Sequence, residues 1–167
     1  MKTCFALLFA AFVSAIAEAP QKELLPLENY AGKWTGSLTG NSEARSSQTG
    51  QWTLDGHFLE VNWVLEPEPD GASKLTGKTI MTFDAAKGVY RSWQYFSTGL
   101  FITAEGTWSE ASRTFTWTAK NPENGDTIVT KATFPTESAE SWSIVGKDAA
   151  GNETLSLSGN NAREKAK

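Results

Sequence analysis

The stretch VYRSWQYFSTGLFITAEGTW, residues 89–108, decides the fold class of this 167-residue chain. Its first eight residues are rich in aromatic and β-branched types, which suit a pleated, half-buried strand. Residues 97–99, Ser-Thr-Gly, then break the run as a turn, and a second run of the same kind extends from Leu100 to Trp108. The segment therefore predicts two antiparallel strands joined by a short hairpin.

The same alternation of apolar and polar positions continues in both directions from this hairpin, with turn residues roughly every eight to twelve positions. The longest break is EPEPDGASK at 66–74, which contains two prolines and an Asp-Gly pair and is predicted to be a loop. One helix is expected, at 22–30, where Leu24, Leu25 and Leu27 could cap one end of a barrel. About ten strands are expected: one around Trp34 and others at 47–54, 59–65, 75–83, 89–96, 100–108, 113–120, 127–134, 141–147 and 153–158.

Short strands joined in sequence by tight turns favour an all-β, up-and-down antiparallel barrel, because closing the sheet removes its exposed edges. A two-sheet sandwich is the alternative. Its Greek-key crossings need long connections, and only the 66–74 loop has any length. We expect one barrel domain over residues 20–160 and a disordered tail over 161–167.

The first nineteen residues have the features of a secretory signal peptide. Lys2 provides a positive start, an apolar run covers 5–13, and small residues allow cleavage after Ala17 or Ala19. The apolar run is too short to span a bilayer as a stable helix. The mature protein is therefore expected to be exported, to the periplasm or the extracellular space, without inserting into a membrane.

Composition excludes several kinds of chemistry. The only cysteine, Cys4, lies in the proposed signal peptide, so a mature protein would have no disulfide, thiolate metal site or thiol nucleophile. The net charge is -4 and no basic stripe is present, which argues against nucleic acid as a partner. No metal-binding spacing appears, and nothing indicates a cofactor.

Two resemblances support the barrel prediction. Gly32-Lys33-Trp34, after the short helix, is similar to the Gly-x-Trp signature of calycins, which implies that Trp34 seals the closed end of the barrel. Residues 81–126 and 142–152, together with LDGHFLEV at 54–61, resemble the domain of unknown function 1579 family of exported bacterial proteins. That resemblance implies a calycin-like, or lipocalin-like, barrel and no particular activity.

His57 is the only histidine and follows Asp55-Gly56, a strong hairpin-turn signal. It would begin a strand, and Glu60, three positions on, would face the opposite side of the sheet. The two cannot form a local acid–base pair, and no serine-hydrolase, zinc-protease or phosphate-loop motif is present. A histidine at a turn or barrel rim is therefore favoured over a catalytic one.

The seven tryptophans give the main functional signal. Filling a small barrel explains bulky inward residues without a ligand, but aromatic side chains in mid-strand could also line a pocket if they point inward. Arg91 would then hold an anionic group of the ligand, with Glu105 balancing its charge; an outward Arg91 in a surface ion pair is the alternative. The candidate ligand-binding residues are Trp63, Arg91, Trp93, Tyr95, Trp117, Trp142 and His57.

The leading hypothesis is an exported, non-catalytic barrel that binds a small apolar or amphipathic ligand in an aromatic-lined cavity. One rival is an enzyme that uses His57 or carboxylates in the same cavity. The other rival is a filled barrel that serves as an interaction module. The presence of a cavity would favour the binding or enzyme hypothesis, and a solidly packed interior would favour the interaction module.

Overall fold

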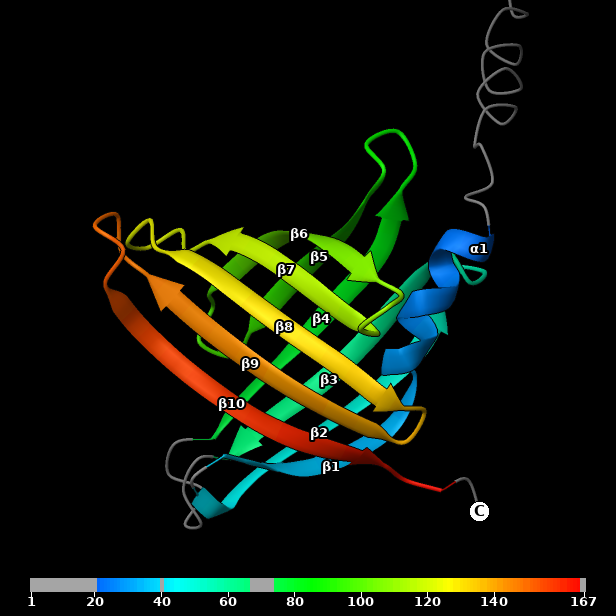
Figure 1. Cartoon of the computed structure of the whole chain (residues 1–167), viewed down its shortest axis with the longest axis horizontal. Coiled ribbons are helices and arrows are strands. Elements are labelled where there is room, and N and C mark those ends of the chain that lie inside the picture. Colours follow the sequence, from blue (N-terminus) through cyan, green and yellow to red (C-terminus); the bar gives the residue numbers. More distant parts are fainter. Residues whose placement is uncertain (1–20, 40, 67–73, 166–167) are drawn as a thin grey trace, which may run out of the picture.

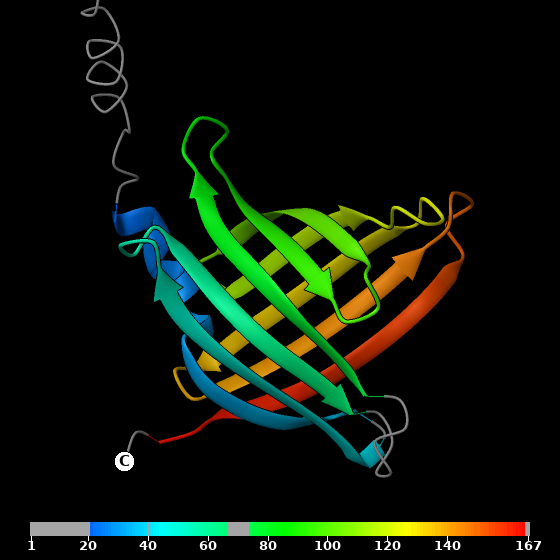
Figure 2. The same ribbon diagram turned by 180° about the vertical axis from the view of Figure 1, so that it is seen from behind.

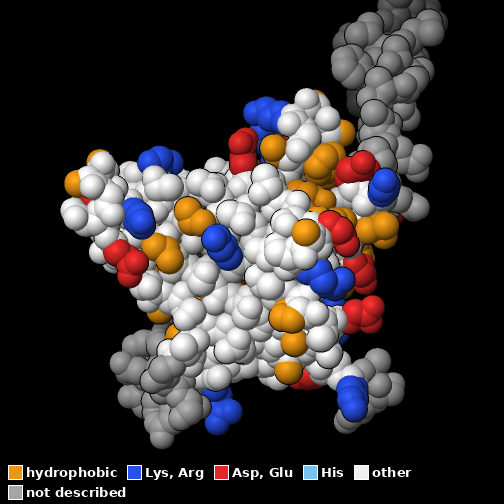
Figure 3. All heavy atoms as spheres, viewed as in Figure 1, with side chains coloured by type: hydrophobic (Ala, Val, Ile, Leu, Met, Phe, Trp, Pro, Cys, Tyr) orange, Lys and Arg blue, Asp and Glu red, His pale blue; other side chains and the backbone are white. Residues whose placement is uncertain are grey.

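The computed structural model describes residues 21–39, 41–66 and 74–165. The predicted signal peptide, both cleavage positions, the middle of the 66–74 loop and the last two residues of the predicted tail lie outside these ranges. In the described part of the chain, no helix has the length and apolar character needed to cross a membrane. On the face shown in Figure 3, lysine and arginine side chains are scattered rather than gathered into a patch.

Ten antiparallel strands form one closed barrel (Figures 1 and 2). Each strand pairs with its neighbours in sequence, and β1 closes the barrel against β10. The up-and-down barrel is therefore confirmed, and the sandwich alternative is wrong. The strands are β1 (Gly32–Leu38), β2 (Asn41–Thr53), β3 (Phe58–Glu66), β4 (Leu75–Asp84), β5 (Val89–Phe96), β6 (Phe101–Ser109), β7 (Thr114–Lys120), β8 (Thr127–Thr136), β9 (Ala139–Lys147) and β10 (Glu153–Arg163).

A short helical segment lies at one end of the barrel (Figure 1). It consists of α1 (Gln21–Leu24) and the 3-10 helix η1 (Leu25–Tyr30), which has a proline in its first turn, where no amide donor is needed. Leu24 and Leu27 are buried, as expected of residues that cap the barrel, but Leu25 is 65% exposed. The Tyr90 hydroxyl of β5 donates a 2.8 Å hydrogen bond to the Glu23 carbonyl and ties the segment to the wall.

Trp34 in β1 is fully buried at the same end of the barrel. Its ring packs edge-on against Phe134 at 6.0 Å, and its Nε1 donates a 3.1 Å hydrogen bond to the Ala31 carbonyl. The Arg163 guanidinium lies 4.7 Å from the Trp34 ring, within range of a cation–π contact. Trp34 therefore joins the first strand, the last strand and the η1 segment.

The Asp-Gly hairpin forms between β2 and β3. Leu54, Asp55 and Gly56 have φ values of 49°, 57° and 83°, and the His57 amide donates a 3.2 Å hydrogen bond to the Leu54 carbonyl. Left-handed backbone of this kind favours glycine and tolerates aspartate, which explains the sequence signal. His57 lies immediately before β3.

The last strand is longer than expected. The sequence placed the end of the domain at residue 160, but β10 pairs with β1 as far as Arg163. Asn161 is buried, and the Arg163 side chain donates a 3.0 Å hydrogen bond to the Asn29 carbonyl of η1. These contacts hold residues 161–163 in the sheet, so the predicted tail begins too early.

Candidate ligand-binding cavity

The barrel encloses a cavity of about 410 Å³ on the side of the core away from the Trp34 end. Nearly every strand contributes an apolar side chain to its wall, because inward positions alternate with outward ones along each strand. Examples are Val61, Met81, Ile102, Ile128, Ile144 and Leu157. The interior is therefore hollow and largely apolar.

Three of the predicted tryptophans lie in the cavity wall, each against a glycine directly opposite on the neighbouring strand. At Gly77, an added Cβ would lie 2.1 Å from the Trp63 ring. The indole can therefore lie flat only because Gly77 has no side chain. Flat indoles keep the middle of the barrel open and cover the backbone that glycine exposes. The three pairs are Trp63 with Gly77, Trp117 with Gly106 and Trp142 with Gly159.

Several polar side chains also line the cavity, and four of them form one hydrogen-bonded cluster: Ser46, Gln48, Glu140 and Asn161. The Asn161 Nδ2 donates a 2.7 Å hydrogen bond to Glu140 Oε2, and the Gln48 Nε2 donates a 3.0 Å bond to the same oxygen. The Ser46 hydroxyl donates a 2.6 Å bond to Asn161 Oδ1. The carboxylate of Glu140 is thus oriented by two neutral amides.

Gly36 allows this cluster to form. It lies between Ser46 of β2 and Asn161 of β10 in the strand register, and a Cβ there would come within 2.3 Å of Asn161 Oδ1 and 1.9 Å of the Asn160 carbonyl oxygen. Because glycine has no side chain, the Asn161 amide can cross over β1 and reach Ser46. The glycine in β1 therefore allows side chains of β2 and β10, two strands that do not pair with each other, to form a hydrogen bond.

Glu140 is only 5% exposed, and burial raises the pKa of its carboxyl to about 7 despite the hydrogen bonds from Asn161 and Gln48. Burial, together with the nearby charge of Glu140, raises the pKa of the Tyr30 hydroxyl well above its usual range. The Trp117 Nε1 donates a 3.1 Å hydrogen bond to that hydroxyl, which keeps Tyr30 at the base of the cavity. Glu140 is therefore a carboxyl that changes charge near neutral pH inside an apolar chamber.

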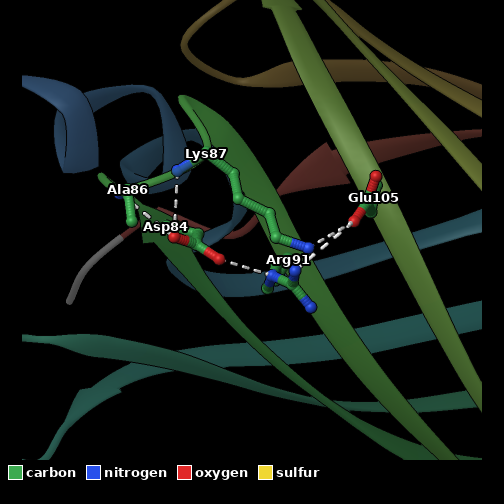
Figure 4. A network of polar contacts seen from close by, with 5 residues as sticks. All are labelled: Asp84, Ala86, Lys87, Arg91 and Glu105. Atoms are coloured by element: carbon green, nitrogen blue, oxygen red, sulfur yellow. Dashed lines mark hydrogen bonds and ion pairs between the residues drawn. The ribbon is translucent and has the colours of Figure 1, made fainter.

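Arg91 lies on the outer face of the barrel. Figure 4 shows its guanidinium between two carboxylates, with Nε 2.8 Å from Asp84 Oδ2 and Nη2 3.4 Å from Glu105 Oε1. The inward positions of β5 are the even-numbered ones, which include Ser92 and Gln94 in the cavity wall. Arg91 thus forms the surface ion pair given as the alternative, with Glu105 as its partner, and does not reach the cavity.

Trp93 and Tyr95 share the outer face with Arg91. The Trp93 ring lies 6.5 Å from that of Phe58, and the Tyr95 ring lies 5.2 Å from that of Phe101. Tyr95 and Phe101 are each 45% exposed. The inward orientation expected for Arg91, Trp93 and Tyr95 is not found, because β5 carries aromatic residues on both faces and its apolar pattern did not fix which face is inward.

His57 lies in the β2–β3 turn and does not line the cavity. Its backbone carbonyl accepts a 2.7 Å hydrogen bond from the Thr82 hydroxyl. Among the residues that the structure describes, no carboxylate pairs with the imidazole, and no group of three or more His, Cys, Asp and Glu side chains is placed to hold a metal ion. The structure therefore separates His57 from the cavity-lining tryptophans.

The sequence does not indicate the polar cluster, because three of its four residues, Ser46, Glu140 and Asn161, lie just outside the predicted strands. The sequence predicts a turn at Glu140, but this residue shares the inward phase of Trp142 and Ile144 in β9. The sequence predicts that Asn161 belongs to the tail, but this residue continues the phase of Leu157 and Gly159 in β10. Extending the alternation by one residue at the start of β9 and by three at the end of β10 places both side chains on the inner face.

No family model matches the chain, and no curated protein matches it. Among solved structures, the S-type phycobiliprotein lyase from Guillardia theta is similar, with a TM-score of 0.60 and 14% sequence identity over 88% of this chain and 93% of that chain. At this identity the likeness concerns the fold and not the activity. The chain therefore has a calycin-like, ten-stranded barrel fold like that of the lyase.

Proposed function

We propose that this protein binds a small, partly apolar ligand in the barrel cavity and does not transform it. The observation that carries the proposal is the interior cavity of about 410 Å³, with largely apolar and aromatic walls and a hydrogen-bonded polar cluster around Glu140. Binding pockets for small molecules commonly have this composition, in which apolar walls supply affinity and a few polar groups fix orientation. The cavity also argues against a filled barrel.

The polar groups that orient the ligand differ from those expected from the sequence. Glu140 and its amide partners lie in the cavity, whereas Arg91 is engaged by Asp84 and Glu105 outside it. Of the aromatic residues expected to contact a ligand, Trp63, Trp117 and Trp142 line the cavity. The likeness to a phycobiliprotein lyase indicates no particular ligand for this chain.

Titration with N-phenyl-1-naphthylamine, a fluorescent apolar probe, tests the proposal. We expect saturable binding with a 1:1 stoichiometry and quenching of tryptophan fluorescence. Ala104→Phe should weaken binding at least about tenfold, because Ala104 is buried in the wall between the small residues Ser92 and Ala119. Thr103→Phe, next in sequence but on the outer face, is the matched control and should bind like the wild type. Equal binding by all three proteins, or by none, would overturn the proposal.

Export and membership of the domain of unknown function 1579 family are parts of the same proposal. The support for export is the leader-like sequence of residues 1–19. The support for membership is the set of sequence stretches at 54–61, 81–126 and 142–152. N-terminal sequencing of the protein recovered from its host tests export: the mature chain should begin at residue 18 or 20, and an intact start at Met1 would contradict it.

One observation favours a second candidate function, an enzyme that moves a proton on a bound substrate. A buried carboxyl with a pKa of about 7 is suited to general acid–base catalysis, and Glu140 has this property inside the cavity. The two candidates differ in what happens to a natural ligand during long incubation with the protein. If the ligand is recovered unchanged, the protein only binds it. If the wild type converts the ligand to a product and Glu140→Gln does not, the protein is an enzyme.

A further inference from the structure

The wall of the cavity carries one acidic side chain and no basic one. Among the described residues that line it, Glu140 is the sole carboxylate, and none is lysine, arginine or histidine. The hydrogen-bond donors that reach the carboxylate, Asn161 and Gln48, are neutral amides. An ionised Glu140 therefore has no counter-charge within the cavity.

One oxygen of this carboxylate also remains open. Both hydrogen bonds to the carboxylate fall on Oε2, and within the described part of the chain Oε1 accepts none. Glu140 is nevertheless 95% buried by the surrounding protein, with 5% of its surface exposed. Because Oε1 is not among the fully buried atoms that lack a partner, it faces the open space of the cavity, where a bound molecule can donate a hydrogen bond to it.

The cavity also presents aromatic faces close to this carboxylate. Tyr30 and Trp117 lie at the base of the cavity with Glu140, and Trp142 is two positions further along β9 on the same face. Aromatic faces attract cations as well as apolar groups. An ammonium group with an apolar body would thus meet a carboxylate at one end and π-systems and aliphatic walls along its length.

We propose that the ligand is an amine, whose ammonium group pairs with Oε1 of Glu140 while its apolar body fills the aromatic-lined cavity. This inference rests on the proposed binding function and names the chemical class of the ligand. It also excludes fatty acids and other carboxylates as preferred ligands, because their charge would face Glu140 without a basic residue to offset the repulsion.

Charge at Glu140 links binding to pH. The groups facing it are Tyr30 from η1, Gln48 from β2, Asn161 from β10 and uncharged wall residues of β8, so Glu140 alone changes charge near neutrality. Its pKa of about 7 means that raising the pH from about 6 to 8 converts the neutral acid to the carboxylate. Amine affinity should rise over that interval, while a neutral ligand should show little change.

Three naphthalene compounds of similar size provide the test: 1-naphthylmethylamine, 1-naphthylmethanol and 1-naphthylacetate. Each compound is titrated into the purified protein at about pH 8. The amine should bind about tenfold more tightly than the alcohol, and the acetate anion should bind more weakly than the alcohol. Between about pH 6 and 8, amine affinity should increase several-fold, with the alcohol as internal reference.

Glu140→Gln keeps the shape and an acceptor for Asn161 and Gln48 but removes the charge. It should lose the tenfold preference for the amine and retain alcohol binding, whereas Glu105→Gln on the outer face should behave like the wild type.

Tighter binding of the alcohol or acetate than of the amine by the wild type would overturn this inference and leave the proposed function standing. Failure of all three compounds to bind would overturn both. The wild-type pH series decides the matter even if Glu140→Gln does not fold, since a flat amine profile contradicts the proposal.

Discussion

At the scale of single residues, Glu140 and Gly36 determine the character of the cavity. Glu140 places an ionisable group where water is largely excluded, and its pKa of about 7 reflects that burial. Gly36 leaves the space through which Asn161 reaches Ser46, so the amide that orients Glu140 is itself held in place. Neither residue belongs to a recognisable sequence motif.

The raised pKa of Glu140 predicts that folding stability depends on pH. The carboxyl has a pKa near 4.5 when unfolded and about 7 when folded, so the folded protein retains a proton that the unfolded chain releases between these values. The contribution of Glu140 to the free energy of unfolding is therefore most favourable below about pH 4.5, and it is lost as the pH rises through about 7. The full loss corresponds to about 3 kcal/mol.

Glu140→Gln should remove this dependence. In denaturant unfolding, the variant should match the wild type at about pH 4 and exceed it by up to about 3 kcal/mol at about pH 8. Glu105→Gln, which changes a carboxylate that is 59% exposed, is the control and should show no such growing difference. A constant difference between Glu140→Gln and the wild type at all pH values would refute the buried, proton-retaining carboxyl.

Gly36→Ala should destabilise the barrel by about 3 kcal/mol or more, because the new methyl would lie 1.9 Å from the Asn160 carbonyl oxygen and force the β1–β10 ladder apart. Thr35→Ala, the neighbouring and exposed position, should change the free energy of unfolding by less than about 1 kcal/mol. Chemical denaturation measures both. Similar stabilities for the two variants would show that Asn161 does not need the gap at Gly36.

At the scale of elements, the barrel is divided into a packed end and a hollow end. Around η1, Trp34 and Phe134 fill the interior, together with Tyr30 and Phe115, whose ring centroids are 5.5 Å apart. Further along, the tryptophans lie flat over glycines and leave space. The same residue type thus fills one end of the barrel and lines the other, and the difference depends on what stands opposite on the next strand.

The η1 segment offers a matched pair of leucines that tests its role as a cap. Leu27 is fully buried and Leu25 is 65% exposed, although they are two residues apart. Leu27→Ala should lower the free energy of unfolding by about 2–5 kcal/mol, since it leaves a cavity in the packed end. Leu25→Ala should change it by about 0.5 kcal/mol or less. Equal effects in thermal or chemical unfolding would show that η1 does not close the barrel.

At the scale of the whole molecule, the strand count and the up-and-down order follow from the sequence because turn residues separate the strands clearly. The inward phase follows where apolar residues occupy one parity, as at Trp117 and Ala119 in β7. It does not follow in β5, where Tyr90 and Trp93 fall on opposite faces and either phase would bury an aromatic ring. For that reason the sequence leaves both orientations of Arg91 open, toward the cavity and toward a surface ion pair.

The polar cluster depended on contacts that no local pattern reveals. Ser46 and Asn161 are 115 positions apart, and only barrel closure brings them within hydrogen-bonding distance. The hydrogen-bond partners of Glu140 likewise come from distant parts of the chain, Gln48 from β2 and Asn161 from β10. A sequence reading could have placed Glu140 on the inner face by extending β9, but its missing counter-charge becomes visible only when the cavity wall is assembled.

The central claim is that the cavity holds a small molecule, and native mass spectrometry of the protein purified from its own host tests it most directly. The account predicts a discrete additional mass of one small molecule on the wild-type protein, released by organic solvent and absent from the Ala104→Phe variant isolated in the same way. A wild-type protein that carries only the mass of its polypeptide, or an adduct that Ala104→Phe retains unchanged, would contradict the claim.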